Sequence, residues 1–162
     1  MIAVIDSGIV MNTSLLPKIE HDIVIPQQVM DEIKSNLAKH LIEMLRANRN
    51  FTVIEPMKKY LDQARMTAQQ MGQNRLSNQD IAVLATALEI AKQTEIILYS
   101  DDYGVRNVAH ELGFKSEGIT TTGGAQKRYY HYQCRACGTI STEIIKECDI
   151  CGHTKFKRLR QN

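Results

Sequence analysis

Short runs of apolar residues alternate along the first 115 positions with segments whose apolar residues recur every three or four positions. The runs that resemble strands are residues 2–5, 21–25, 51–55 and 95–99. An unbroken apolar run is typical of a strand buried on both faces, whereas the longer period is typical of a helix with one buried face. This alternation predicts an α/β fold in which helices flank a parallel sheet and the crossovers are right-handed.

The helical segments differ in the strength of their apolar pattern. One helix is expected from Pro26 to about Asn48, because apolar residues recur there at spacings of four and three: Val29, Ile33, Leu37, Leu41 and Met44. A thinner stripe predicts a second helix over residues 57–71. The clearest start is at Ser77, where Asp80 follows at the spacing of a capping box. A short helix is expected from Val105 to Leu112.

Carboxylates stand where the predicted strands and helices meet. Asp6 follows the first strand, and Asp101 and Asp102 follow the strand at 95–99, while Glu32 and Asp80 lie early in predicted helices. In a parallel sheet the carboxyl ends of the strands share one edge, where ligands collect. A desolvated carboxylate there needs a hydrogen-bond donor, an ion-pair partner or a bound cation. Clustered carboxylates suit Mg²⁺ or Mn²⁺.

Each of these acids also has a purely structural interpretation. Asp80 could serve only as the capping acid of its helix, and Asp6 could be an ordinary turn residue. A solvated helix surface is the simpler interpretation for Glu32, whose neighbour Asp31 competes for the same role. Their joint placement is what favours a metal site.

The four cysteines form two CxxCG motifs, Cys134–Cys137 and Cys148–Cys151, separated by ten residues. Two such motifs can supply four thiolates to one structural zinc ion, and the glycine after each lets the backbone turn. Two disulfides or a rubredoxin-like iron site are the alternatives. The length of the segment also favours zinc, because about thirty residues have too little core to fold without a bound metal.

The chain therefore divides into residues 1–116, an α/β domain; residues 117–128, a flexible linker containing Thr120–Gly124; and residues 129–162, a four-cysteine ribbon with a basic tail. Residues 1–115 carry 12 Lys and Arg against 14 Asp and Glu, whereas residues 116–162 carry eight against four. The basic end permits phosphate binding without requiring it. Hydrophobic residues are 43% and charged residues 23%, as in soluble globular proteins. With no secretory pattern at the start and no long uncharged apolar segment, we expect a cytoplasmic protein without membrane contact.

The acid pattern resembles that of the PIN-domain ribonucleases over about residues 1–115. The matching features are Asp6-Ser7, Glu32, Asp80 and Ser100-Asp101-Asp102. The family pattern of hydroxyl residue, any residue, then Asp favours Asp102 as the last ligand, and the adjacent Asp101 is the alternative. A PIN-like domain followed by a four-cysteine ribbon is similar to the archaeal form of the NIN-one-binding endonucleases, which trim the 3′ end of precursor small-subunit rRNA.

This resemblance implies a metal-dependent endoribonuclease. Its catalytic set would be Asp6, Glu32, Asp80 and Asp101 or Asp102, with Asp6 and Asp102 as the main Mg²⁺ or Mn²⁺ ligands. Its partners would be precursor rRNA, the pre-small ribosomal subunit and possible assembly factors. The ribbon would supply the phosphate contacts: Lys127, Arg128, Arg135, Lys155, Lys157, Arg158 and Arg160. Tyr129, Tyr130 and Phe156 could stack on bases or form the small core of the ribbon.

Two other functions fit parts of the sequence. A VapC-like toxin is also a PIN ribonuclease, but such toxins are typically a bare PIN domain, so the ribbon argues against it. A non-catalytic RNA-binding scaffold would not need the intact acid set.

Overall fold

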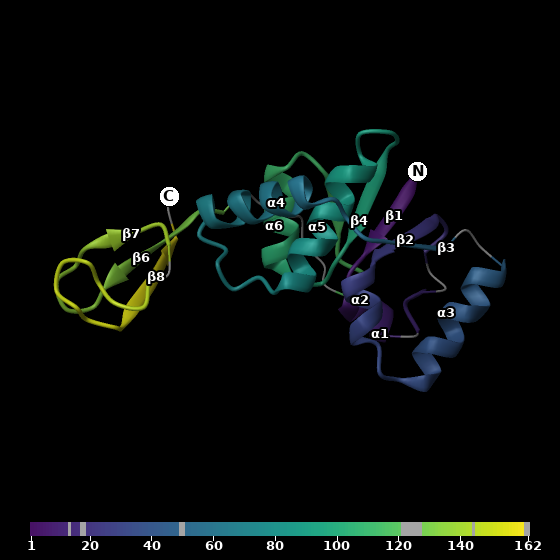
Figure 1. Ribbon diagram of the computed structural model, residues 1–162, viewed down its shortest axis with the longest axis horizontal. Coiled ribbons are helices and arrows are strands. Elements are labelled where there is room, and N and C mark those ends of the chain that lie inside the picture. The colour runs from purple at the N-terminus through teal and green to yellow at the C-terminus, as the bar shows by residue number, and fades with distance from the viewer. Residues whose placement is uncertain (13, 17–18, 49–50, 121–127, 144, 161–162) are drawn as a thin grey trace.

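A five-stranded parallel sheet forms the centre of the larger domain in the computed structural model (Figure 1). The structure describes residues 1–12, 14–16, 19–48, 51–120, 128–143 and 145–160. The strand order is β3-β2-β1-β4-β5, with bounds β1 (Ile2–Ile5), β2 (Asp22–Pro26), β3 (Phe51–Ile54), β4 (Ile96–Tyr99) and β5 (Lys115–Glu117). Each neighbouring pair is parallel. The predicted α/β class and its parallel sheet are confirmed.

Helices cover this sheet: α1 (Ser7–Met11), α2 (Gln27–Glu32), α3 (Asn36–Asn48), α4 (Lys58–Gln70), α5 (Asn78–Ile90) and α6 (Tyr103–Glu111). The α5 helix is buried on all sides from Ile81 to Leu88, because α4, α6 and the sheet pack around it. A helix that is apolar all round belongs in a core. Among the described helices, none is long and apolar enough to cross a membrane.

The single helix predicted over residues 26–48 is wrong. The chain leaves the helix at Ile33, whose backbone is extended, and a new helix begins at Asn36 after Ser35 accepts a hydrogen bond from the Ala38 amide at 3.4 Å. The break changes which residues face the core. Leu37 and Met44 are 66% and 50% exposed, whereas the buried positions of α3 are Ala38, Ile42 and Leu45.

The cysteine-rich end forms a separate antiparallel sheet of order β7-β6-β8, from β6 (Tyr130–Cys134), β7 (Ile140–Ser141) and β8 (Phe156–Arg160). We call residues 129–160 the ribbon. Most of the predicted linker, residues 121–127, lies outside the described residues, and β5 already includes Glu117.

The ribbon docks against the turn that follows α4. The Tyr130 amide donates to the Met71 carbonyl at 2.9 Å, and the Tyr132 hydroxyl donates to the Gly72 carbonyl at 2.9 Å. Gly72 has φ +65, and a Cβ there would lie 2.2 Å from the Tyr130 carbonyl oxygen. This close approach between two backbones was not predicted from the sequence. In Figure 1 the ribbon lies beside the end of α4.

Candidate active site and metal centre

Asp6 lies at the carboxyl end of β1, in the middle of the sheet, and is only 7% exposed. It caps α1 by accepting a hydrogen bond from the Ile9 amide at 2.9 Å. Burial raises the pKa of Asp6; hydrogen bonds from Ser100 and Ile9 oppose the rise, and the negative charges of Asp80 and Asp101 add to it. A buried carboxylate among like charges favours either a proton or a bound cation. This site therefore has the electrostatics of a cation site.

Ser100 joins the acids of β1 and β4. The register pairs Ile5 with Tyr99, so the next residues, Asp6 and Ser100, are also neighbours. The buried Ser100 hydroxyl bonds to the Asp6 carboxylate and accepts from the Asp102 amide at 3.1 Å. Ser100 therefore links Asp6 to Asp102 at the carboxyl ends of β1 and β4. We call this place, with Asp6, Asp101 and Asp102, the acidic edge.

Asp101 and Asp102 point to different partners. Asp101 accepts from the amides of Ile119 and Thr120 at 2.9 and 3.0 Å and from the Thr120 hydroxyl at 2.6 Å. Asp102 is the N-cap of α6, where its Oδ1 accepts from the Gly104 amide. Asp101 is half-buried and fixes the loop after β5, whereas Asp102 is exposed.

Asp80 forms the capping box predicted for α5. Its Oδ2 accepts from the Ser77 amide at 2.8 Å and from the Ser77 hydroxyl at 2.9 Å, while the Asp80 amide donates back to that hydroxyl at 3.1 Å. The same charge raises the pKa of Asp6. Asp80 thus caps its helix and also belongs to the acidic group around Asp6.

Glu32 is placed differently from the expectation. Because the predicted helix is two helices, Glu32 is the last residue of the six-residue α2 and is not in a first turn. It is half-buried, and α2 packs against α1 and α5. The competing Asp31 is exposed and accepts a hydrogen bond from Gln27 at 2.8 Å.

Asp80 and Asp101 lie near enough to Asp6 for their charges to raise its pKa, but the carboxylates do not form a closed coordination sphere. Among the residues that the structure describes, the four cysteines are the only group of three or more potential ligands brought together. The acidic edge therefore remains a predicted metal site, supported by the chemistry of its oxygen donors and by the burial of Asp6.

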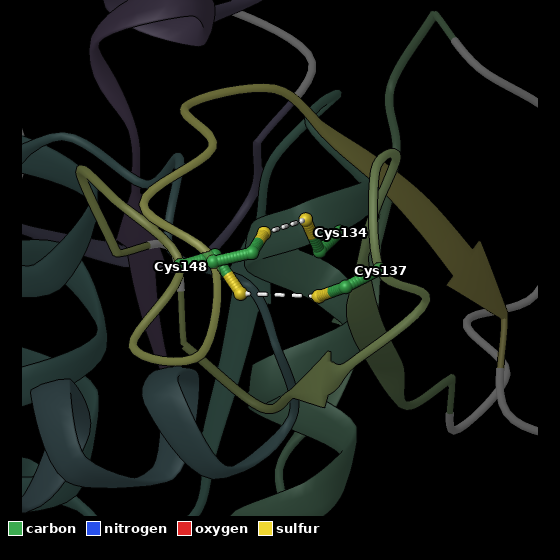
Figure 2. A group of neighbouring side chains, drawn as sticks. Cys134, Cys137 and Cys148 are labelled. Carbon is green, nitrogen blue, oxygen red and sulfur yellow. Dashed lines mark hydrogen bonds between the residues drawn. The ribbon is translucent and has the colours of Figure 1, made fainter.

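The four cysteine sulfurs lie within 4.8 Å of one another. Figure 2 shows Cys134, Cys137 and Cys148 directed toward a common centre, with 3.5 Å between the sulfurs of Cys137 and Cys148. The Cys134 and Cys151 sulfurs are 3.6 Å apart, and all four cysteines are free rather than disulfide-bonded. Thiolates 2.3 Å from a tetrahedral zinc ion would be about 3.8 Å apart. The cluster therefore fits zinc.

The two CxxCG motifs fold in the same way. Gly138 and Gly152 have φ of 78° and 69°, and their amides donate to the carbonyls of Cys134 and Cys148 at 3.0 and 2.8 Å. Hydrogen bonds from the Thr139 hydroxyl and amide lower the pKa of Cys137 to about 6. A thiol with a lowered pKa is more readily present as the thiolate that binds metal.

The predicted RNA-binding residues fall into two groups. Four of them are exposed on the ribbon: Arg135, Lys155, Lys157 and Arg160. Arg128 and Arg158 instead lie at the contact between the domains, where Arg158 donates to the Gln73 side chain at 2.7 Å. Lys127 lies outside the described residues. Gln73 and Tyr103 were not predicted from the sequence, although Tyr103 directly follows the candidate ligand Asp102.

Comparisons with known proteins agree with this architecture. A family model described as the PIN domain of ribonuclease matches residues 3–90. The chain is 36% identical to Endoribonuclease Nob1 of Archaeoglobus fulgidus over 117 residues, covering 70% of this chain and 69% of that protein. It is 33% identical to Ribonuclease VapC1 of Thermoplasma acidophilum over 156 residues, covering 94% and 76%. Endoribonuclease Nob1 of Methanocaldococcus jannaschii is 32% identical over 127 residues, covering 77% and 61%.

Proposed function

The chain belongs to the PIN-domain ribonucleases, and on that premise we propose that it is an endoribonuclease that cleaves precursor small-subunit rRNA at its 3′ end. The buried, like-charged environment of Asp6 is the observation that carries the proposal, because a bound cation would stabilise the ionised carboxylate at the edge of the sheet. Three similar proteins bear the name Endoribonuclease Nob1 at 32–36% identity. The partners of this chain would be precursor rRNA and the pre-small ribosomal subunit, in the cytoplasm.

We assign different catalytic roles to the candidate carboxylates. Asp6 and Asp102 are the proposed main ligands of Mg²⁺ or Mn²⁺, while Glu32 and Asp80 complete the site or orient the attacking water. Such an ion supplies an activated water and neutralises charge on the leaving oxygen. Ser100 holds Asp6 and the Asp102 backbone in register, which keeps the two carboxylates at one edge.

The ribbon would hold one structural zinc ion and bind RNA. Four thiolates and a zinc ion together carry a net charge of −2, so the exposed basic residues of the ribbon must outweigh that charge to attract phosphate. Arg135, Lys155, Lys157 and Arg160 are available for this role, because their side chains are exposed.

A VapC-like toxin is the second candidate, and one observation favours it. The match to Ribonuclease VapC1 covers 94% of this chain, so it extends well beyond the PIN domain. Residues after the PIN domain were expected to argue against a toxin, but their presence alone does not separate the two classes. The relatives named Endoribonuclease Nob1 make rRNA the better supported substrate.

The substrate can be tested with three RNAs. The purified protein is incubated with Mn²⁺ and either a precursor spanning the 3′ end of small-subunit rRNA, a tRNA or an mRNA. We expect one discrete cut at the mature rRNA end. Cutting of tRNA alone, or equal degradation of all three RNAs, rejects rRNA maturation, and no cutting of any RNA favours a non-catalytic scaffold.

A further inference from the structure

A pocket of about 300 Å³ lies between the two domains, beside the acidic edge. Its walls come from three places: the turn after α4, the beginning of α6 and the ribbon. Asp102 is part of the wall, so the pocket opens next to the proposed catalytic centre. Its volume lies within the range of sites that bind small groups.

Three arginines make this pocket positive. Arg75 comes from the turn before α5, Arg128 directly precedes the ribbon, and Arg158 lies on β8 of the ribbon. Asp102 is the one acidic residue of the lining. The pocket therefore carries a formal charge of +2 beside a group of carboxylates. A positive recess at that position favours an anionic group.

Hydrogen bonds and stacking hold the backbone of Arg128 and the guanidinium of Arg158. The Asn107 side chain accepts from the Arg128 amide at 2.7 Å and donates to the Arg128 carbonyl. The Arg158 guanidinium stacks on the Tyr130 ring at 3.7 Å and donates to Gln73 at 2.7 Å. Because the Arg158 guanidinium is already held, an anion that binds it does not have to order that side chain first.

An aromatic surface borders the arginines. Tyr103 is 52% exposed, while the guanidinium of Arg106, which is 1% exposed, lies 4.4 Å from the centre of its ring. The buried arginine supports the ring from beneath, so the ring presents a fixed surface next to Asp102. Single-stranded RNA is commonly held by unstacked bases on aromatic rings and by phosphates on arginines.

We propose that this pocket binds the nucleotide adjacent to the scissile phosphate, with its phosphate on the arginines and its base on Tyr103. The inference rests on the proposed function and adds a subsite to it. It means that the ribbon builds part of the active site as well as contacting RNA at a distance. The ligand is thus a single-stranded, unpaired nucleotide rather than a base pair, because stacking on Tyr103 needs a base that has left its helix.

The test uses variants that leave the domain contact intact. Arg75→Ala removes one pocket charge, and Arg75 takes no part in the hydrogen bonds described above that join the ribbon to Met71, Gly72 and Gln73. Arg46→Ala, on the exposed surface of α3, is the matched control for charge. Tyr103→Leu removes the aromatic ring. The probe is a fluorescein-labelled single-stranded RNA of about ten nucleotides from the rRNA cleavage region, measured without Mg²⁺ so that it is not cut.

We expect Arg75→Ala to reduce the slope of log affinity against log salt by about 0.7, whereas Arg46→Ala keeps the wild-type slope. Removing the base next to the cleavage position should weaken wild-type binding by about 5- to 150-fold. Tyr103→Leu should be insensitive to that removal. Either an unchanged slope for Arg75→Ala, or full sensitivity to base removal in Tyr103→Leu, overturns the subsite. Failure of the wild type to cut the precursor instead rejects the proposed function, whatever the binding results.

Discussion

Replacing Gly72 with alanine should separate the ribbon from the nuclease domain. Gly72 has φ +65, which an alanine adopts at a cost of about 1–2 kcal/mol. The added Cβ would also lie 2.2 Å from the Tyr130 oxygen and 2.8 Å from its carbonyl carbon. Both atoms are backbone, so β6 has to move away.

The magnitude follows from the contacts that this movement breaks. Two hydrogen bonds are at stake, from the Tyr130 amide to the Met71 carbonyl and from the Tyr132 hydroxyl to the Gly72 carbonyl. Each contributes about 0.5–1.5 kcal/mol to the stability of the docked ribbon. Their loss destabilises docking by about 1–3 kcal/mol, which corresponds to roughly 5- to 150-fold faster hydrogen exchange of the Tyr130 amide.

Gly113→Ala is the matched control. Gly113 also has a positive φ, +86, but a Cβ there would meet nothing within 4 Å. It therefore carries the conformational cost without the collision. We expect its Tyr130 amide to exchange as slowly as in the wild type. Equal exchange rates in the Gly72→Ala and Gly113→Ala variants would refute the close contact between the domains.

The remaining predictions concern the acids and the cysteines. Asp6→Asn should abolish cleavage and yet raise the melting temperature of the metal-free protein at neutral pH, because asparagine is an equally good N-cap. The direction of this change follows from the raised pKa of Asp6. As pH rises through that pKa, ionisation of Asp6 destabilises the folded state, whereas the asparagine side chain does not ionise. A lower melting temperature by calorimetry contradicts this. Asp102→Asn should reduce the cleavage rate more than Asp101→Asn does. The main effect of Asp101→Asn should be increased mobility of Ile119 and Thr120, measured by NMR, because Asp101 bonds to their amides. If Asp101→Asn reduces the rate more, Asp101 is the ligand. Cys148→Ser should reduce the zinc content from about one ion per chain to near zero and unfold the ribbon, while the dispersed NMR signals of residues 1–116 persist. Collapse of both domains contradicts the view that they fold separately.

Four strands of the parallel sheet were predictable because each is a mainly apolar run, and Asp6 and Asp101 were predictable because they follow two of those strands. Asp6 and Asp101 are brought together by the pairing of β1 with β4, which places the ends of the two strands side by side. The cysteine centre was equally accessible, since its ligands lie in two local motifs.

The errors arose where tertiary packing decides the outcome. The apolar period of residues 29–44 continues through Ser35, but Ser35 caps a new helix, and α3 buries Ala38 and Ile42 in place of Leu37. The pocket between the domains could not be predicted, because its walls are far apart in the sequence. Gln73 meets Arg158 only once β6 has docked on Gly72.

The most direct test of the proposed function compares the wild type with Asp6→Asn on precursor small-subunit rRNA in Mn²⁺, with the cut mapped at single-nucleotide resolution. The account predicts one cut at the mature 3′ end by the wild type. It predicts no cut by Asp6→Asn, with RNA affinity unchanged within a few fold, because Asp6 serves the metal and not the phosphate contacts. A cut at the same position by Asp6→Asn at the wild-type rate would contradict it.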